Sequence, residues 1–170
     1  MEHPAVSVSE RQRFRLGGSC ATVESVLREL AHRDQLELAG ANSTNIAEIE
    51  EKFGVVSRFW RTPSDFIAHA NAAVVYYQNA MAAICYSAAT ADQGAEIDVM
   101  TLPEFRKLGL GKVAVAGFVE TCQQQGVEPL WDCFTNNIPS MELARSVGYQ
   151  PFSQPYSFYT ITRPALAKRG

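Results

Sequence analysis

The sequence is poor in the residues from which metal and disulfide sites are built. Its three histidines are scattered and form no H-E-x-x-H pattern. The four cysteines are widely separated, with no C-x-x-C pair among Cys20, Cys85, Cys122 and Cys133. Because zinc sites and disulfide frameworks both need regular cysteine spacing, we expect reduced thiols and no metal.

Long apolar runs and a strong net charge are missing too. The longest apolar runs, such as residues 80–91, are interrupted by Tyr and Ser and are too short to span a bilayer. The N-terminus has no signal-peptide pattern, so we expect a cytoplasmic protein without a membrane partner. The net charge is −3, which argues against nucleic acid as a bulk electrostatic partner. A small basic cluster of Arg11, Arg13 and Arg15 is predicted to be a solvated face.

The residues that are present describe one globular domain. Of 170 residues, 46% are hydrophobic and 19% are charged, which is an ordinary balance for a folded chain. No low-complexity linker and no internal repeat divide the sequence. We therefore expect a single domain, residues 1–170, around one core.

Periodicity predicts helices first and then a run of strands. Residues 21–35 and 45–53 have helical spacing, and we expect these helices to form an acceptor-side region within residues 1–55. Thr62 and Pro63 form a typical helix start. Three strand-like stretches follow as a meander, at residues 73–78, 81–88 and 95–101.

The second half of the chain alternates helices with strands. A long apolar helix is predicted over residues 109–125, where Gly126 is placed to end it. A strand over residues 129–134, a helix over 137–147 and a closing hairpin over 149–162 complete the chain. The order β-β-β-α-β-α-β predicts a mixed α/β sandwich.

The most informative segment is the basic, glycine-bearing loop of residues 106–112. It leads from the strand at 95–101 into the long apolar helix. Glycines let backbone approach an anion closely, first-turn amides have no intrahelical partner, and the helix dipole is positive there. Arg106, Lys107 and Lys112 add positive charge, so the loop is predicted to hold a pyrophosphate.

Two other phosphate-binding motifs fit this loop less well. A P-loop requires a serine or threonine after its lysine, and here Val113 follows Lys112. The spacing of Gly109, Gly111 and Ala114 matches a dinucleotide fingerprint, which leaves an NAD-dependent oxidoreductase as an alternative. That fingerprint needs a strand ending at its first glycine, whereas residues 102–108 intervene.

The pattern R-x-x-G-x-G, from Arg106 to Gly111, resembles the acyl-CoA signature of the GCN5-related N-acetyltransferases, the GNAT family. The Trp131-Asp132 strand and the N-x-x-S-x-x-L-A helix that starts at Asn137 resemble one bacterial subgroup. The resemblance covers roughly residues 55–160 and implies an acyl-CoA-binding core at 56–160. It implies the GNAT fold, a mixed α+β fold with a central, mostly antiparallel sheet flanked by helices.

The same resemblance implies acetyl-CoA as the co-substrate and assigns its contacts. The main chain at Val99 and Thr101 is expected to bind the pantetheine arm, and Asn137 to border it. The loop is expected to bind the diphosphate through Arg106, Lys107, Leu108, Gly109, Leu110, Gly111 and Lys112.

Acyl transfer to an amine needs a proton acceptor and benefits from a proton donor. Alternation in the strand at 95–101 puts the carboxylates of Glu96 and Asp98 on one face, so both are candidate bases. The donor is less clear because Ala144 stands where many family members have a tyrosine. Ser140 is the candidate, with Tyr149, Tyr156, Tyr159 or unassisted departure of the thiolate as alternatives.

Asp132 is the one charged residue in a strand of otherwise apolar character. A charge at such a position should face a cleft or a partner. Trp131 beside it is predicted to be a core residue.

Together these features predict an N-acetyltransferase that moves acetyl from acetyl-CoA to a primary amine. The acceptor would be a small molecule or a peptide, attacked directly in a ternary complex, and a homodimer is possible. The alternatives are a catalytically silent acyl-CoA sensor and a toxin that acetylates aminoacyl-tRNA. For the toxin, the net charge of −3 gives little support.

Overall fold

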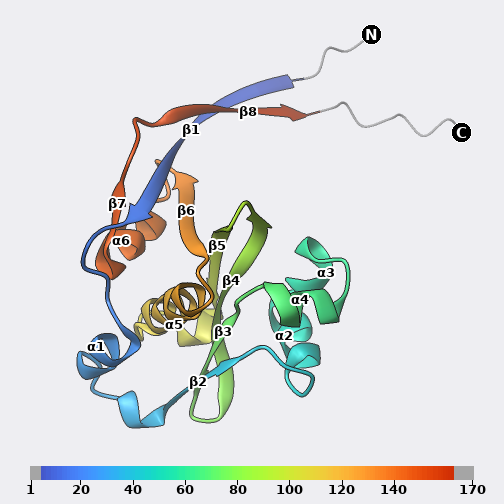
Figure 1. Ribbon diagram of the computed structural model, residues 1–170, viewed down its shortest axis with the longest axis vertical. Coiled ribbons are helices and arrows are strands. Elements are labelled where there is room, and N and C mark those ends of the chain that lie inside the picture. Colours follow the sequence, from blue (N-terminus) through green and yellow to red (C-terminus); the bar gives the residue numbers. More distant parts are fainter. Residues whose placement is uncertain (1–4, 163–170) are drawn as a thin grey trace, which may run out of the picture.

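The computed structural model describes residues 5–162, which form one eight-stranded sheet with helices on both faces (Figure 1). The strand order is β2-β3-β4-β5-β6-β1-β7, and β8 pairs with β1. Neighbours are antiparallel except β5 and β6, which are parallel. The strands are β1 (Ala5–Leu16), β2 (Leu36–Gly40), β3 (Ala73–Tyr77), β4 (Ala80–Ala91), β5 (Gly94–Thr101), β6 (Glu128–Phe134), β7 (Tyr149–Pro151) and β8 (Tyr156–Thr162).

Alternation along the central strands sends apolar side chains to two separate cores. Val75, Ala83 and Cys85 pack with α1, α5 and α6, whereas Val74 and Ile84 pack on the opposite face with α2, α3 and α4. Each helix covers one face of the sheet with its apolar side. The helices are α1 (Val23–Arg28), α2 (Ile46–Phe53), α3 (Val56–Phe59), α4 (Pro63–His69), α5 (Leu110–Gln124) and α6 (Ile138–Val147), with short 3-10 turns η1 (Arg33–Gln35) and η2 (Pro103–Phe105).

The helix starts and stops that the sequence predicts are confirmed where the signal is local. Thr62 caps α4, because its side chain accepts a hydrogen bond from the Asp65 amide. Gly148 ends α6 in the left-handed region, at φ +106°. The three meander strands, the long helix α5 and strand β6 are also found at the predicted places.

Two predictions for the ends of the chain are wrong. The region before residue 55 is not only helical, because β1 and β2 belong to the sheet and α1 stops at Arg28. Its helices α1 and α2 lie on opposite faces of the sheet. The segment 149–162 is not a hairpin, since β7 and β8 each pair with β1 and not with each other. These pairings join the two ends of the chain, so local periodicity carried no signal for them.

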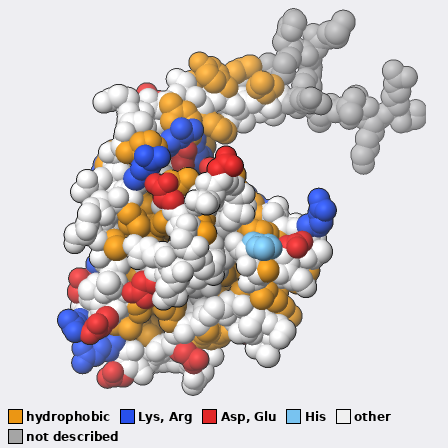
Figure 2. Space-filling model, viewed as in Figure 1, with side chains coloured by type: hydrophobic (Ala, Val, Ile, Leu, Met, Phe, Trp, Pro, Cys, Tyr) orange, Lys and Arg blue, Asp and Glu red, His pale blue; other side chains and the backbone are white. Residues whose placement is uncertain are grey.

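Beyond the body of the sheet, β1 and β8 continue as a two-stranded ribbon that projects from the molecule (Figure 1). Directly opposite residues share a face, and the pairs Val6–Ile161 and Val8–Tyr159 place four large side chains on one face. These side chains are between 58% and 64% exposed. Orange side chains on this ribbon are visible at the top of Figure 2.

Within residues 5–162, no helix has the length and apolar character needed to cross a membrane. All four cysteines are free, and three of them are buried. Burial raises the pKa of the Cys122 thiol to about 12, which keeps it protonated and unreactive.

Candidate active site

The main cavity of the protein lies where the parallel strands β5 and β6 separate. They pair over only three positions, from Gly94–Glu128 to Glu96–Leu130. Past that point the strands diverge and leave a cavity of about 580 Å³. Its walls come from β5, β6, the start of α6 and two arginines, and are formed by Arg11, Ile97, Asp98, Val99, Met100, Thr101, Arg106, Trp131, Asp132, Cys133, Phe134, Asn137, Pro139, Ser140 and Leu143.

One wall of this cavity is the open edge of β5. Val99 and Thr101 pair with β4 on their other side, and both line the cavity. The Val99 amide donates a hydrogen bond to its neighbour, the Asp98 carboxylate, at 2.9 Å. A ligand that uses this amide must therefore displace the Asp98 oxygen.

Asp98 is half-buried and held by two donors. Besides the Val99 amide, the Tyr86 hydroxyl donates to its second carboxylate oxygen at 2.7 Å. Burial and the hydrogen bond with Asp98 raise the pKa of Tyr86 well above its ordinary value. Tyr86 therefore stays protonated and orients a carboxylate that faces the cavity.

Glu96 lies on the same face of β5 as Asp98 but borders a different space. Its exposed side chain lines a second cavity of about 200 Å³, and Asp132 lines both cavities. The two candidate bases are thus on one surface, and only Asp98 reaches the main cavity.

The predicted diphosphate loop joins the main cavity through a third one. This cavity of about 210 Å³ shares Thr101, Arg106 and Leu143 with the main cavity. Lys107 and Gly109 both have left-handed backbones, at φ +66° and +76°. The same cavity is lined by Leu110 and Gly111, which open the first turn of α5, where amides have no intrahelical partner.

The loop is fastened to the N-terminal region. The His32 imidazole donates to the Leu108 carbonyl oxygen at 3.0 Å, so this loop carbonyl is occupied. Lys112 forms an ion pair with Glu29 of the same region at 2.8 Å. Arg106 and Lys107 remain exposed at the mouth of the loop cavity, so they are the cations best placed for an anionic ligand.

Two predicted residues lie at the start of α6. The Asn137 side chain caps this helix by accepting from the Ser140 amide at 3.2 Å. The Ser140 hydroxyl oxygen accepts from the Trp131 indole at 3.2 Å, and both residues line the main cavity. Since that oxygen already accepts a hydrogen bond, its own proton is free to be donated into the cavity.

The tyrosines that could replace the missing proton donor are not equivalent. Tyr149 packs edge-on against Trp131 in the core, 1% exposed, and its hydroxyl has no partner among the described residues. Tyr159 lies on the exposed face of the ribbon. Tyr156 is linked to the main cavity, because its hydroxyl donates at 2.5 Å to the carboxylate of Asp132, which lines that cavity. Ala144 is fully buried within α6.

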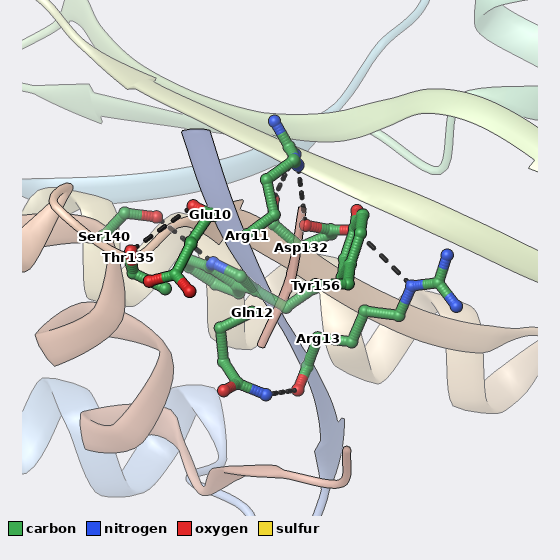
Figure 3. Close-up of polar contacts among 9 residues, drawn as sticks. Glu10, Arg11, Gln12, Arg13, Asp132, Thr135, Ser140 and Tyr156 are labelled. Carbon is green, nitrogen blue, oxygen red and sulfur yellow. Dashed lines mark hydrogen bonds and ion pairs between the residues drawn. The ribbon is translucent and has the colours of Figure 1, made fainter. Parts of the chain in front are cut away.

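The structure adds a polar cluster that the sequence did not reveal as a unit (Figure 3). The Asp132 carboxylate accepts from Arg11 Nε at 2.8 Å and from Tyr156, and Arg13 Nε lies 3.6 Å away. Although partial burial lowers it, the pKa of Arg11 is raised overall by the hydrogen bond and charge of Asp132. The position of Asp132 confirms that this charge faces a cleft, whereas the solvated face predicted for the arginines holds only in part, since Arg11 is half-buried.

Comparison with solved structures identifies the fold of this protein. The fold is similar to a GCN5-related N-acetyltransferase-like protein from Streptococcus suis, with a TM-score of 0.73 and 21% identity, covering 92% of this chain and 62% of that chain. A GCN5-related N-acetyltransferase from Kribbella flavida gives a TM-score of 0.61 and 17% identity, covering 95% of this chain and 61% of that chain. These likenesses establish the GNAT fold.

The family follows from the sequence. The family model described as GNAT acetyltransferase matches residues 6–159, and the chain belongs to this family. It is also similar to the uncharacterized N-acetyltransferase YdfB of Bacillus subtilis (strain 168), 29% identical over 102 residues. That alignment covers 60% of this chain and 39% of YdfB, so the chain spans about two fifths of the length of this relative.

Proposed function

We propose that this protein transfers an acetyl group from acetyl-CoA to a primary amine. The observation that carries the proposal is that the loop cavity at the start of α5 adjoins the main cavity, with Thr101, Arg106 and Leu143 lining both. Asp98 and the open edge of β5 line the main cavity. Membership of the GNAT family supports the interpretation of the two cavities as an acetyl-CoA site.

The residues that line the two cavities fit the parts of acetyl-CoA. The exposed Arg106 and Lys107, with the amides of Leu110 and Gly111, would hold the diphosphate. Thr101 and the β5 edge would hold the pantetheine arm, with Asn137 at its border. Lys112 also lines the loop cavity, but its ammonium group is paired with Glu29, so it would mainly support the loop.

The residues of the main cavity supply proton handling and orientation. When bound, acetyl-CoA supplies a thioester in which the amine forms the C–N bond as the C–S bond breaks. Asp98 would take the proton released by the amine, directly or through water, and pass it to solvent. Ser140 would donate to the departing sulfur, although a thiol with a pKa of about 8.5 can also leave as thiolate.

A small-molecule or peptide amine, attacked directly in a ternary complex, is the acceptor class we propose. The test is release of free thiol from acetyl-CoA in the presence of a panel of amines. Amine-dependent release supports transfer. Binding of acetyl-CoA without release for any amine would favour a silent sensor, a reading to which the buried Ala144 gives some weight.

We predict that Arg106→Ala weakens acetyl-CoA binding about tenfold. A cation that hydrogen-bonds a phosphate adds a charge-assisted contact, and about tenfold in affinity corresponds to about 1.4 kcal/mol. The affinity would be measured by isothermal calorimetry.

Arg28→Ala is the matched control for this change. Arg28 is an exposed arginine of α1 that pairs with Glu24 and does not line the loop cavity. It should leave acetyl-CoA affinity unchanged. Equal affinities of wild type and Arg106→Ala would remove this residue from the diphosphate site.

The homodimer expected from the sequence stays a proposal, and the ribbon of β1 and β8 supports it. Positions 6–9 and 157–162 carry no charged residue, although exposed strands are usually protected by charges. A second copy offers the same uncharged apolar face, so two ribbons can pack about a two-fold axis without like-charge repulsion.

Val8→Glu is predicted to convert such a dimer to a monomer, because it buries two carboxylates at the contact. Light scattering coupled to size exclusion would show the molecular mass halved. The matched control is Ser7→Glu, on the opposite face of the ribbon, which should leave the mass unchanged. A monomeric wild-type protein at high concentration would refute the dimer.

A further inference from the structure

The open face of the sheet beside the main cavity carries its charges in two rows. Glu96 and Asp98 project from β5, while three arginines, at alternate positions, project from β1. Strand β6 lies between them, pairing with Glu96 through Leu130 and with Arg13 through Asp132. With about 4.8 Å between neighbouring strands, the backbones of β5 and β1 are about 10 Å apart at Glu96, the last position where β5 pairs with β6. Basic and acidic side chains gather below the ribbon in Figure 2.

A cavity of about 200 Å³ lies between the rows. Arg13 and Arg15 line one side of it, and Glu96 lines another. Trp131 and Asp132 line both this cavity and the main one, so the two cavities adjoin. A molecule seated here would lie next to the main cavity, which Asp98 lines.

Aromatic rings hold both arginines of this cavity in place. The Arg13 guanidinium carbon lies 4.8 Å from the centre of the Tyr156 ring, and that of Arg15 lies 4.4 Å from the Phe152 ring. Stacking fixes the plane of a guanidinium and leaves its N–H edge available. A fixed N–H edge suits two-point binding of a carboxylate or phosphate.

The charges of these two arginines are only weakly compensated. Asp132 is already bound by Arg11 and Tyr156, and Arg13, with its side chain 57% exposed, lies 3.6 Å from it. Arg15 meets Glu128 at 3.2 Å, with both side chains 54% exposed. Exposed ion pairs of this kind are weak, so an anionic ligand can displace them. In Figure 3 the Arg13 side chain extends away from Arg11, on the other side of Asp132.

We propose that this cavity is the acceptor subsite and that it takes an amine which also carries an anionic group, a carboxylate or a phosphate. Arg13 and Arg15 bind the anionic group, and Glu96 attracts the ammonium group and guides it to Asp98. The opposed charges of the two rows match a zwitterion better than a simple amine. This inference rests on the acetyl transfer proposed above and names its acceptor class.

The experiment compares matched acceptors and matched variants. Thiol release from acetyl-CoA is measured with 4-aminobutyrate against butylamine, and with 2-aminoethyl phosphate against ethanolamine. The variants are Arg13→Gln and Arg15→Gln, with Arg28→Gln on α1 as control, and melting temperatures show that each is folded. We expect KM for the anionic acceptors to rise about tenfold in the first two variants, with KM for the neutral amines unchanged.

Equal use of anionic and neutral amines by the wild type would overturn the proposal, as would variants that raise both KM values equally. Binding without acetyl-CoA, followed by ligand-observed NMR, separates the subsite from the reaction. If no amine releases thiol but the anionic amines bind wild type and not Arg13→Gln, the subsite stands and the transfer fails. If no anionic amine binds, the subsite is refuted. The better of the two anionic acceptors distinguishes carboxylate from phosphate.

Discussion

Gly148→Ala is expected to destabilise the fold by about 3–4 kcal/mol, lowering the melting temperature by about 10 °C. A Cβ atom at this position would lie 2.5 Å from the Ser19 carbonyl oxygen and 3.0 Å from the Cys20 Cα. Both are backbone atoms, so no side chain can move aside. The glycine also has φ +106°, a conformation that alanine adopts only with strain.

The position matters because hydrogen bonds connect the end of α6 to the segment that follows β1. The Gly17 amide donates to the Gly148 carbonyl at 2.9 Å, and the Ala21 amide donates to the Val147 carbonyl at 2.9 Å. Displacing Gly148 would loosen both contacts and the adjoining pairing of Leu16 with Tyr149. The cost therefore includes more than local backbone strain.

Gly54→Ala is the matched control for this change. Gly54 also ends a helix with a left-handed backbone, at φ +63°, and a Cβ atom there would meet nothing within 4 Å. It should cost only about 1 kcal/mol, the conformational term alone. Chemical denaturation measures both values, and equal losses would show that the contact with Ser19 adds nothing.

The sequence reveals the parts of this fold whose signals are contiguous. A cap such as Thr62, a stop such as Gly148 and the alternation of residues 95–101 each depend on neighbouring residues, and all predict correctly. Strand β1 has no such marker, because its partners β6, β7 and β8 lie at the other end of the chain. For that reason the sequence predicted a solvated face for all three of its arginines.

In the candidate site, too, the sequence reveals consecutive residues and misses contacts between residues far apart in the chain. The loop from Arg106 to Lys112 could be recognised because its glycines and cations are consecutive. The cluster around Asp132 could not, since Arg11 and Asp132 are 121 residues apart. Only the isolated charge in β6 pointed to it. Two further points needed the structure. The ion pair with Glu29 distinguishes Lys112 from the other cations of the loop, and burial in the core distinguishes Tyr149 from the other candidate proton donors.

Asp98→Asn is expected to lower kcat about 100- to 1000-fold while acetyl-CoA affinity stays within about threefold. The amide cannot accept the proton that the amine releases, whereas the carboxylate faces the main cavity and is oriented by Tyr86 and the Val99 amide. Glu96→Gln should mainly raise the acceptor KM, because Glu96 borders the smaller cavity. Steady-state kinetics and calorimetry separate the two effects.

Asp92→Asn provides the control for loss of a carboxylate on the same sheet. Asp92 lies in the turn between β4 and β5 with a left-handed backbone, which asparagine also tolerates, and it is exposed. Its kcat should match that of wild type. If Asp98→Asn retains kcat within about threefold and Glu96→Gln loses more than about 100-fold, the proton acceptor is Glu96, and the small cavity rather than the main one is where the amine is deprotonated.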